Sequence, residues 1–134
     1  MAFSHHISPT IPVVDIERAR KFYEDKLGLQ PLAASRSAVI YDCGEGTTLF
    51  LYKGRPSNAE HVIAAFEVEN IRERVKQLET VGITFEEHNM PGIDKLVDVA
   101  TVGPDEAAWF KDSEGNILAL LQLGMMLELA EHIV

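Results

Sequence analysis

Two histidines occupy matching places in the chain and could hold a metal ion. His6 and His61 are 55 residues apart, the same separation as Asp15 and Asn70, which each precede a helical pattern. Histidine is the commonest side-chain metal ligand, so the pair could bind a metal, hydrogen-bond a ligand at a pocket rim, or be structural or exposed. A catalytic metal normally needs three protein ligands. No Asp or Glu completes the set on the strand positions that could face the pair, which hold Thr48, Phe50, Ile117, Ala119 and Leu121.

Glu67 is a second candidate for chemistry, because it shares the strand parity of His61 and would point to the same face. A buried carboxylate there could bind a cationic ligand or act as a base in metal-free catalysis; the alternative is an exposed charge at a strand edge. The single cysteine, Cys43, has no adjacent base and cannot form an intramolecular disulfide. No glycine-rich phosphate loop opens a helix, and no nucleophile elbow is present.

The elements that must position these residues are organised around a hairpin that occurs twice. Residues 107–122 repeat residues 38–53 without a gap when Gly115 is aligned with Gly46. The alignment places Phe110 on Tyr41, Glu114 on Glu45, Leu118 on Leu49 and Leu120 on Leu51. Each copy has an apolar run, a polar turn with glycine and a second apolar run, which predicts a β-hairpin. The chain is therefore predicted to be an internal duplication.

Each half has the same predicted order of elements. The first half, about residues 1–54, has an alternating strand at 7–14, a helix between Asp15 and Gly28, and strands near 29–34, 37–42 and 47–53. A linker near 54–59 precedes the second half, about residues 60–123. This half has a strand at 62–68, a helix between Asn70 and Gly82, and strands near 83–86, 96–102 and 106–111 before the last strand of the hairpin. A short helix near 125–133 carries an apolar stripe that would pack on the chain's own sheet or contact another subunit. The fold class is α+β, with two tandem βαβββ modules in one domain.

Composition limits the classes of partner. The chain has 134 residues, 46% of them hydrophobic, and a net charge of −9. Such a charge would repel phosphate backbones and anionic membrane surfaces, so we expect neither nucleic acid nor a membrane as a partner. No apolar run is long enough to cross a bilayer and no signal peptide is evident, so we expect a cytoplasmic protein.

The chain resembles the vicinal oxygen chelate superfamily, the group of glyoxalases, bleomycin resistance proteins and extradiol dioxygenases. Two motifs carry the resemblance: PVVDIERARKFYEDKLGL at the front, and Phe110-x-Asp112-x-x-Gly115-Asn116 in the second hairpin. The resemblance covers nearly the whole chain. It implies that the sheets of the two modules form a curved cup that holds the ligand. Members commonly associate in pairs, so we expect a homodimer.

Enzymes of this superfamily hold a divalent metal with His, Gln or Glu on the first and last strands of each module. The matching positions here are Ser8, Phe50, Ile63 and Ala119. Three cannot coordinate a metal, and a serine hydroxyl is a poor ligand. The resemblance therefore implies a metal-free protein of the bleomycin resistance type, with no cofactor, that binds a small, partly apolar ligand without chemistry.

The expected ligand pocket faces the cup. Its residues are His6, Ser8, Thr10, Phe50, Tyr52, His61, Ile63, Ala65, Glu67, Trp109 and Ala119. Two other functions stay open: a metal-dependent lyase, isomerase or dioxygenase that uses His6 and His61, and a stress or interaction protein with a vestigial pocket. Catalytic residues are not assigned.

Overall fold

The computed structural model describes residues 7–86, 94–96, 99–102 and 104–124. The predicted helix near 125–133 and the candidate ligand His6 lie outside the described residues. The chain divides into two compact units. Unit 1 comprises the chain to Ala59 together with the turn Asp112–Asn116, and unit 2 comprises Glu60–Lys111 and the chain from Ile117. No helix among the described residues is long and apolar enough to cross a bilayer.

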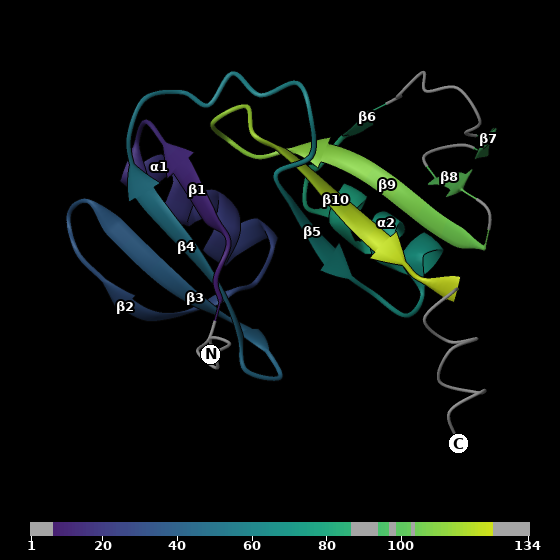
Figure 1. Ribbon diagram of the computed structural model, residues 1–134, viewed down its shortest axis with the longest axis horizontal. Coiled ribbons are helices and arrows are strands. Elements are labelled where there is room, and N and C mark those ends of the chain that lie inside the picture. Colours follow the sequence, from purple (N-terminus) through teal and green to yellow (C-terminus); the bar gives the residue numbers. More distant parts are fainter. Residues whose placement is uncertain (1–6, 87–93, 97–98, 103, 125–134) are drawn as a thin grey trace, which may run out of the picture. The chain divides into compact units, whose positions relative to one another are not determined.

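Unit 1 contains one four-stranded mixed sheet and one helical segment (Figure 1). The strands lie in the order β1-β4-β3-β2, with β1 parallel to β4 and the other pairs antiparallel. Its elements are β1 (Thr10–Val13), α1 (Ile16–Arg20), the π-helical segment η1 (Lys21–Lys26), β2 (Gln30–Ala34), β3 (Ala38–Gly44) and β4 (Thr47–Lys53).

The helical segment begins and ends where the sequence predicts. Asp15 caps α1, since its Oδ1 accepts a hydrogen bond from the Arg18 backbone N–H at 3.0 Å. Gly28 follows the segment with φ of 73°, a conformation that glycine adopts at little cost. The second half of the segment is wound as a π-helix, which the sequence pattern did not predict. The neighbouring Phe22 and Tyr23 are both buried in it.

Strand β1 starts at Thr10, later than the predicted start at residue 7. Ile7 is 91% exposed, so its apolar side chain is not part of the core. Pro9 has no N–H to give to a strand ladder, although its carbonyl accepts a hydrogen bond from Phe50 N at 3.0 Å. The prediction of a strand over 7–14 was therefore right in type and too long at its start.

Unit 2 repeats this plan with additional strands. A mixed sheet has the order β5-β10-β9-β8-β7, and β6 also pairs with β9. The predicted strand at 96–102 is two paired strands in the structure, β7 and β8. The elements are β5 (Ala64–Glu67), α2 (Ile71–Thr80), β6 (Phe85–Glu86), β7 (Asp94–Leu96), β8 (Val99–Val102), β9 (Asp105–Lys111) and β10 (Ile117–Gln122).

The structure confirms the duplicated hairpin and the α+β fold class. Tyr41 lies opposite Leu49 in β3 and β4, and Phe110 lies opposite Leu118 in β9 and β10. All four side chains are buried. In unit 1 the strand positions of this parity face α1 and η1, so the duplicated residues form the core between sheet and helix.

Candidate functional site

The sheet of unit 1 leaves its other face partly open. The residues of this open face alternate with the buried ones along each strand and form two cross-strand rows: Thr10, Phe50 and Ile40, and then Pro12, Tyr52 and Ala38. Tyr52 is 38% exposed, and Phe50 and Ile40 are half-buried. Two aromatic rings on an accessible sheet face can contact a ligand by stacking and burial.

Tyr52 lies against the glycine that follows β4. A Cβ added to Gly54 would lie 3.2 Å from Cε2 of the Tyr52 ring and 3.6 Å from Cβ of Pro12. Only a residue without a side chain leaves the ring in its present place. A side chain at position 54 would therefore require the Tyr52 ring to move by a few tenths of an ångström.

Along β9 and β10 the matching face of unit 2 is buried and carries Trp109 among smaller side chains. Ala119 lies between Ala65 of β5 and Trp109 of β9. Trp109 is 8% exposed. It belongs to a buried cluster whose other members are Ala100, Ala107, Ile117 and Ala119, with Val62 and Leu121 packed against it.

The remaining predicted pocket residues of unit 2 differ in exposure, and a common pocket for them stays a prediction. Ile63 is half-buried and donates its backbone N–H to the Ile117 carbonyl at 3.0 Å. His61 and Ala65 are exposed. Glu67 is exposed at the end of β5 and lines a hollow of about 370 Å³ at the start of α2, beside Glu69 and Glu73. The exposure of Glu67 on the edge strand β5 agrees with the alternative of a charge at a strand edge.

The four positions that the resemblance matches to the family's metal do not carry side chains that fit a divalent ion. Phe50, Ile63 and Ala119 have no donor atom, and Ser8 Oγ lies 3.4 Å from its neighbouring carbonyl at Pro9. Among the residues that the structure describes, no three His, Cys, Asp or Glu side chains are grouped so that they could hold an ion.

The turn motif of the second hairpin has a structural role. Tyr23 Oη donates to Asp112 Oδ2 at 2.6 Å inside unit 1. Asp112 Oδ1 accepts from the backbone N–H groups of Glu114 and Asn116, both at 2.8 Å. Burial and the neighbouring Asp112 carboxylate raise the pKa of Tyr23, so the phenol stays protonated and donating. These polar groups satisfy one another and are not available for a ligand.

The Glu114 carboxylate, like that of Asp112, accepts several hydrogen bonds within unit 1. Its Oε1 accepts from the backbone N–H groups of Val14 at 3.0 Å and Asp15 at 2.9 Å, and its Oε2 accepts from Arg18 Nε at 2.6 Å. The hydrogen bond from Arg18 is the main reason that the pKa of Glu114 falls to about 2. Nearby, Asn116 Nδ2 donates to the Pro12 carbonyl at 3.0 Å. In the sequence, the structural role of this turn is indicated by polar side chains at every second position, Asp112, Glu114 and Asn116.

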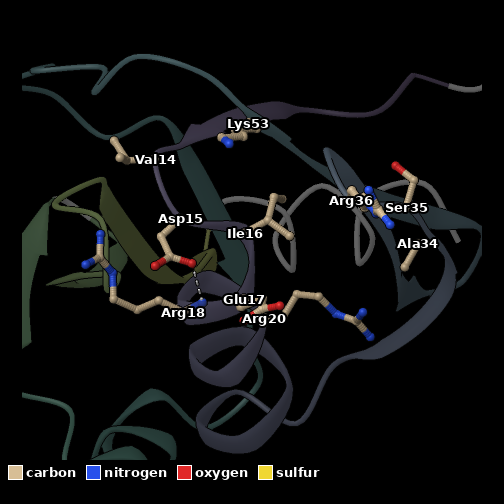
Figure 2. Close-up of a pocket in the computed structure, with 10 residues that line it drawn as sticks. All are labelled: Val14, Asp15, Ile16, Glu17, Arg18, Arg20, Ala34, Ser35, Arg36 and Lys53. Atoms are coloured by element: carbon tan, nitrogen blue, oxygen red, sulfur yellow. Dashed lines mark hydrogen bonds between the residues drawn. The ribbon is translucent and has the colours of Figure 1, made fainter.

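A groove that sequence reasoning missed lies beside α1 (Figure 2). It has a volume of about 930 Å³ and combines four cations with two carboxylates and an apolar wall. In the view of Figure 2, Val14 and Arg18 lie at one end, and Ala34, Ser35 and Arg36 lie at the other. The lining residues are Val14, Asp15, Ile16, Glu17, Arg18, Arg20, Ala34, Ser35, Arg36 and Lys53.

Comparisons with known proteins agree with this architecture. A family model described as Glyoxalase/Bleomycin resistance protein/Dioxygenase superfamily matches residues 4–120. No match was found among curated proteins.

Several solved structures share the fold. An antibiotic-binding protein from Streptomyces sp. CB03234 is 23% identical with a TM-score of 0.67, over 91% of this chain and 98% of that one. The fosfomycin resistance protein FosX from Listeria monocytogenes, solved with Mn(II) and sulfate, is 13% identical with a TM-score of 0.70, over 98% and 99%. A lactoylglutathione lyase from Agrobacterium tumefaciens is 18% identical with a TM-score of 0.66, over 93% and 98%.

Proposed function

The chain belongs to the glyoxalase/bleomycin resistance protein/dioxygenase superfamily, and from this membership we propose that it binds a small, partly apolar molecule on the open face of unit 1, without a catalytic metal. One observation carries the proposal. Phe50 lies beside Thr10 and Ile40 on an accessible sheet face, at a position that the resemblance matches to a metal-holding residue of the family's enzymes. A ligand there would be held by aromatic contact and burial, not by coordination.

The chemistry of the open face favours a flat ligand with few polar groups. Phe50 and Tyr52 supply two rings, and the hydroxyl groups of Thr10 and Tyr52 supply hydrogen-bonding groups that could orient the ligand. A structural relative described as an antibiotic-binding protein supports a binding role for this fold, whereas FosX with its Mn(II) supports the alternative of metal chemistry. The side chains at the metal positions of this chain favour the first.

We also propose a homodimer in the cytoplasm. Strand β2, whose residues are all exposed and whose Leu32 is 60% exposed, offers apolar surface away from the ligand site that association would cover. Light scattering at micromolar concentration would give twice the mass of one chain, and a monomer mass would contradict the dimer.

Ligand binding can be tested by NMR with a library of neutral, flat aromatic compounds. We expect at least one compound to give saturable shifts at the amides of Thr10, Phe50 and Tyr52. Phe50→Ala should weaken that binding about tenfold or more, because it removes most of the apolar contact. Val81→Ala is the matched control, since Val81 is 42% exposed at the end of α2 and should not matter. If no compound shifts these amides, or if the control weakens binding as much, the proposal fails.

The metal alternative is tested separately by thermal unfolding. An ion that binds only the folded state stabilises it by about 2.7 kcal/mol at a hundredfold excess over its dissociation constant. We expect zinc, nickel and manganese to leave the melting temperature nearly unchanged. A stoichiometric ion that survives dialysis and is lost in His61→Ala would place the protein in the metal-dependent class.

A further inference from the structure

We propose that the groove beside α1 is a second binding site, which takes a small organic carboxylate with an apolar body. This site goes beyond the proposed function, because it lies on the other side of the unit 1 sheet from the open face. Ala34 pairs with Val39 of β3, and Val39 pairs with Leu51 of β4, so the three side chains lie on one face of the sheet. Lys53 lies two residues after Leu51 in β4 and therefore points to the same face. These positions face the helix side of the sheet, whereas Phe50 and Tyr52 face away from it.

Two of the four groove cations are already neutralised. Arg18 Nε and Nη2 contact the Glu114 carboxylate at 2.6 and 3.0 Å. Arg20 Nε contacts Glu24 Oε2 at 2.6 Å. Both guanidinium groups are therefore committed to carboxylates that do not line the groove.

Arg36 and Lys53 are the cations that remain for a ligand. In the described part of the chain, neither makes an ion pair with a carboxylate. Both are exposed. In a protein of net charge −9, Arg36 and Lys53 offset the two groove carboxylates, Asp15 and Glu17, so an anion can approach these two cations without an excess of negative charge around it. The hydroxyl of Ser35, next to Arg36 in Figure 2, adds a donor.

The remaining lining residues restrict the charge and shape of the ligand. Asp15 and Glu17 line the same groove and would repel a ligand with a second negative charge. Val14, 42% exposed, and Ala34 offer apolar surface beside the buried Ile16. A monoanion with an apolar body therefore fits better than a phosphate ester or a polyanion.

The first arm of the test titrates the folded, isotopically labelled chain with benzoate, benzyl alcohol and phenyl phosphate. We expect benzoate to give saturable shifts at the amides of Ser35, Arg36 and Lys53. Benzyl alcohol, which has a similar apolar body without the charge, should bind about tenfold more weakly or worse. The inference is overturned if benzoate gives no saturable shifts there, if benzyl alcohol binds equally well, or if phenyl phosphate binds more tightly than benzoate.

The second arm separates the site from general charge. The double variant Arg36→Gln, Lys53→Gln should weaken benzoate about tenfold or more, whereas Lys21→Gln, Lys76→Gln should leave the affinity unchanged. Both variants remove two positive charges from exposed residues, and the control residues do not line the groove. Equal weakening in both variants would overturn the inference. Because shifts at Phe50 and Tyr52 report on the other sheet face, failure here is distinguishable from failure of the proposed function.

Discussion

The two units bury the same duplicated core, but the sheet faces that point away from that core differ. In unit 1 the cross-strand pair on this face is Ile40 and Phe50, which are half-buried; in unit 2 the aligned pair is Trp109 and Ala119, which are buried. The large side chain has moved from one strand of the hairpin to the other. Duplication has preserved the residues that the fold needs, and the faces that a ligand could contact have diverged.

The two hairpin turns differ in the same way. Glu45 and Glu114 are aligned in the repeat. Glu45 is exposed with φ of 52° in a tight turn beside Gly46, whereas the Glu114 side chain is 1% exposed and accepts hydrogen bonds inside unit 1. One carboxylate belongs to a solvent-facing turn, and the other is part of the structure.

Truncation of the cross-strand residues should give the largest difference between the units. Trp109→Ala removes a buried indole and should reduce the free energy of unfolding by about 3–5 kcal/mol, because it leaves a cavity. Ile40→Ala is the control and should cost about 1–2 kcal/mol, because Ile40 is half-buried. Urea denaturation of the two variants measures this. Equal losses would show that the two faces are packed alike.

Removal of a turn carboxylate should rank next. Asp112→Ala deprives Tyr23 Oη and two backbone N–H groups of their acceptor, and we expect a loss of about 2–4 kcal/mol in chemical denaturation. Asp42→Ala in the first hairpin removes one exposed hydrogen bond, to Gly44 N, and should cost about 1 kcal/mol or less. If Asp42→Ala cost as much, the second turn would have no special role.

Acid should reveal the difference between Glu114 and Glu45. The folded pKa of Glu114 is lowered from 4.5 to about 2, so its stabilisation is complete above pH 4.5 and is lost as the pH falls through about 2. We expect Glu114→Gln to cost about 1–2 kcal/mol at pH 7, allowing for screening around Arg18, whose side chain is 56% exposed. That cost should shrink toward zero near pH 2, measured by denaturation at each pH. A cost independent of pH would show that the carboxylate charge is not involved, and Glu45→Gln should cost little at pH 7.

The smallest effect should come from Gly54→Ala, which sharpens the description of the open face. The new Cβ would lie 3.2 Å from the Tyr52 ring and displace it by a few tenths of an ångström. We expect a loss of stability under about 1 kcal/mol and a change in the Tyr52 ring resonances by NMR. Gly124 is not a suitable control, because a Cβ there would meet the Pro104 backbone. Unchanged Tyr52 resonances would mean that the ring is not held by this contact.

Local patterns in the sequence determined the elements and the core of this protein. Asp15 and Asn70 cap helices because their side chains reach a backbone N–H three residues ahead. The alternation around Tyr41 and Phe110 predicted buried strand faces because side chains in a strand alternate between two faces. The side chains at the positions that the resemblance matches to the family's metal could also be read directly from the chain.

Tertiary structure alone decided what the polar and aromatic side chains do. Tyr23 and Asp112 are separated by 89 residues, and Arg18 and Glu114 by 96. No spacing rule predicts which distant partners meet, so the turn motif looked like a family signature until its hydrogen bonds were seen. The burial of Trp109, expected in a pocket, and the groove containing Arg36 and Lys53 likewise depend on how separate strands pack together. Periodicity fixes the face on which a side chain lies, and only packing fixes what covers that face.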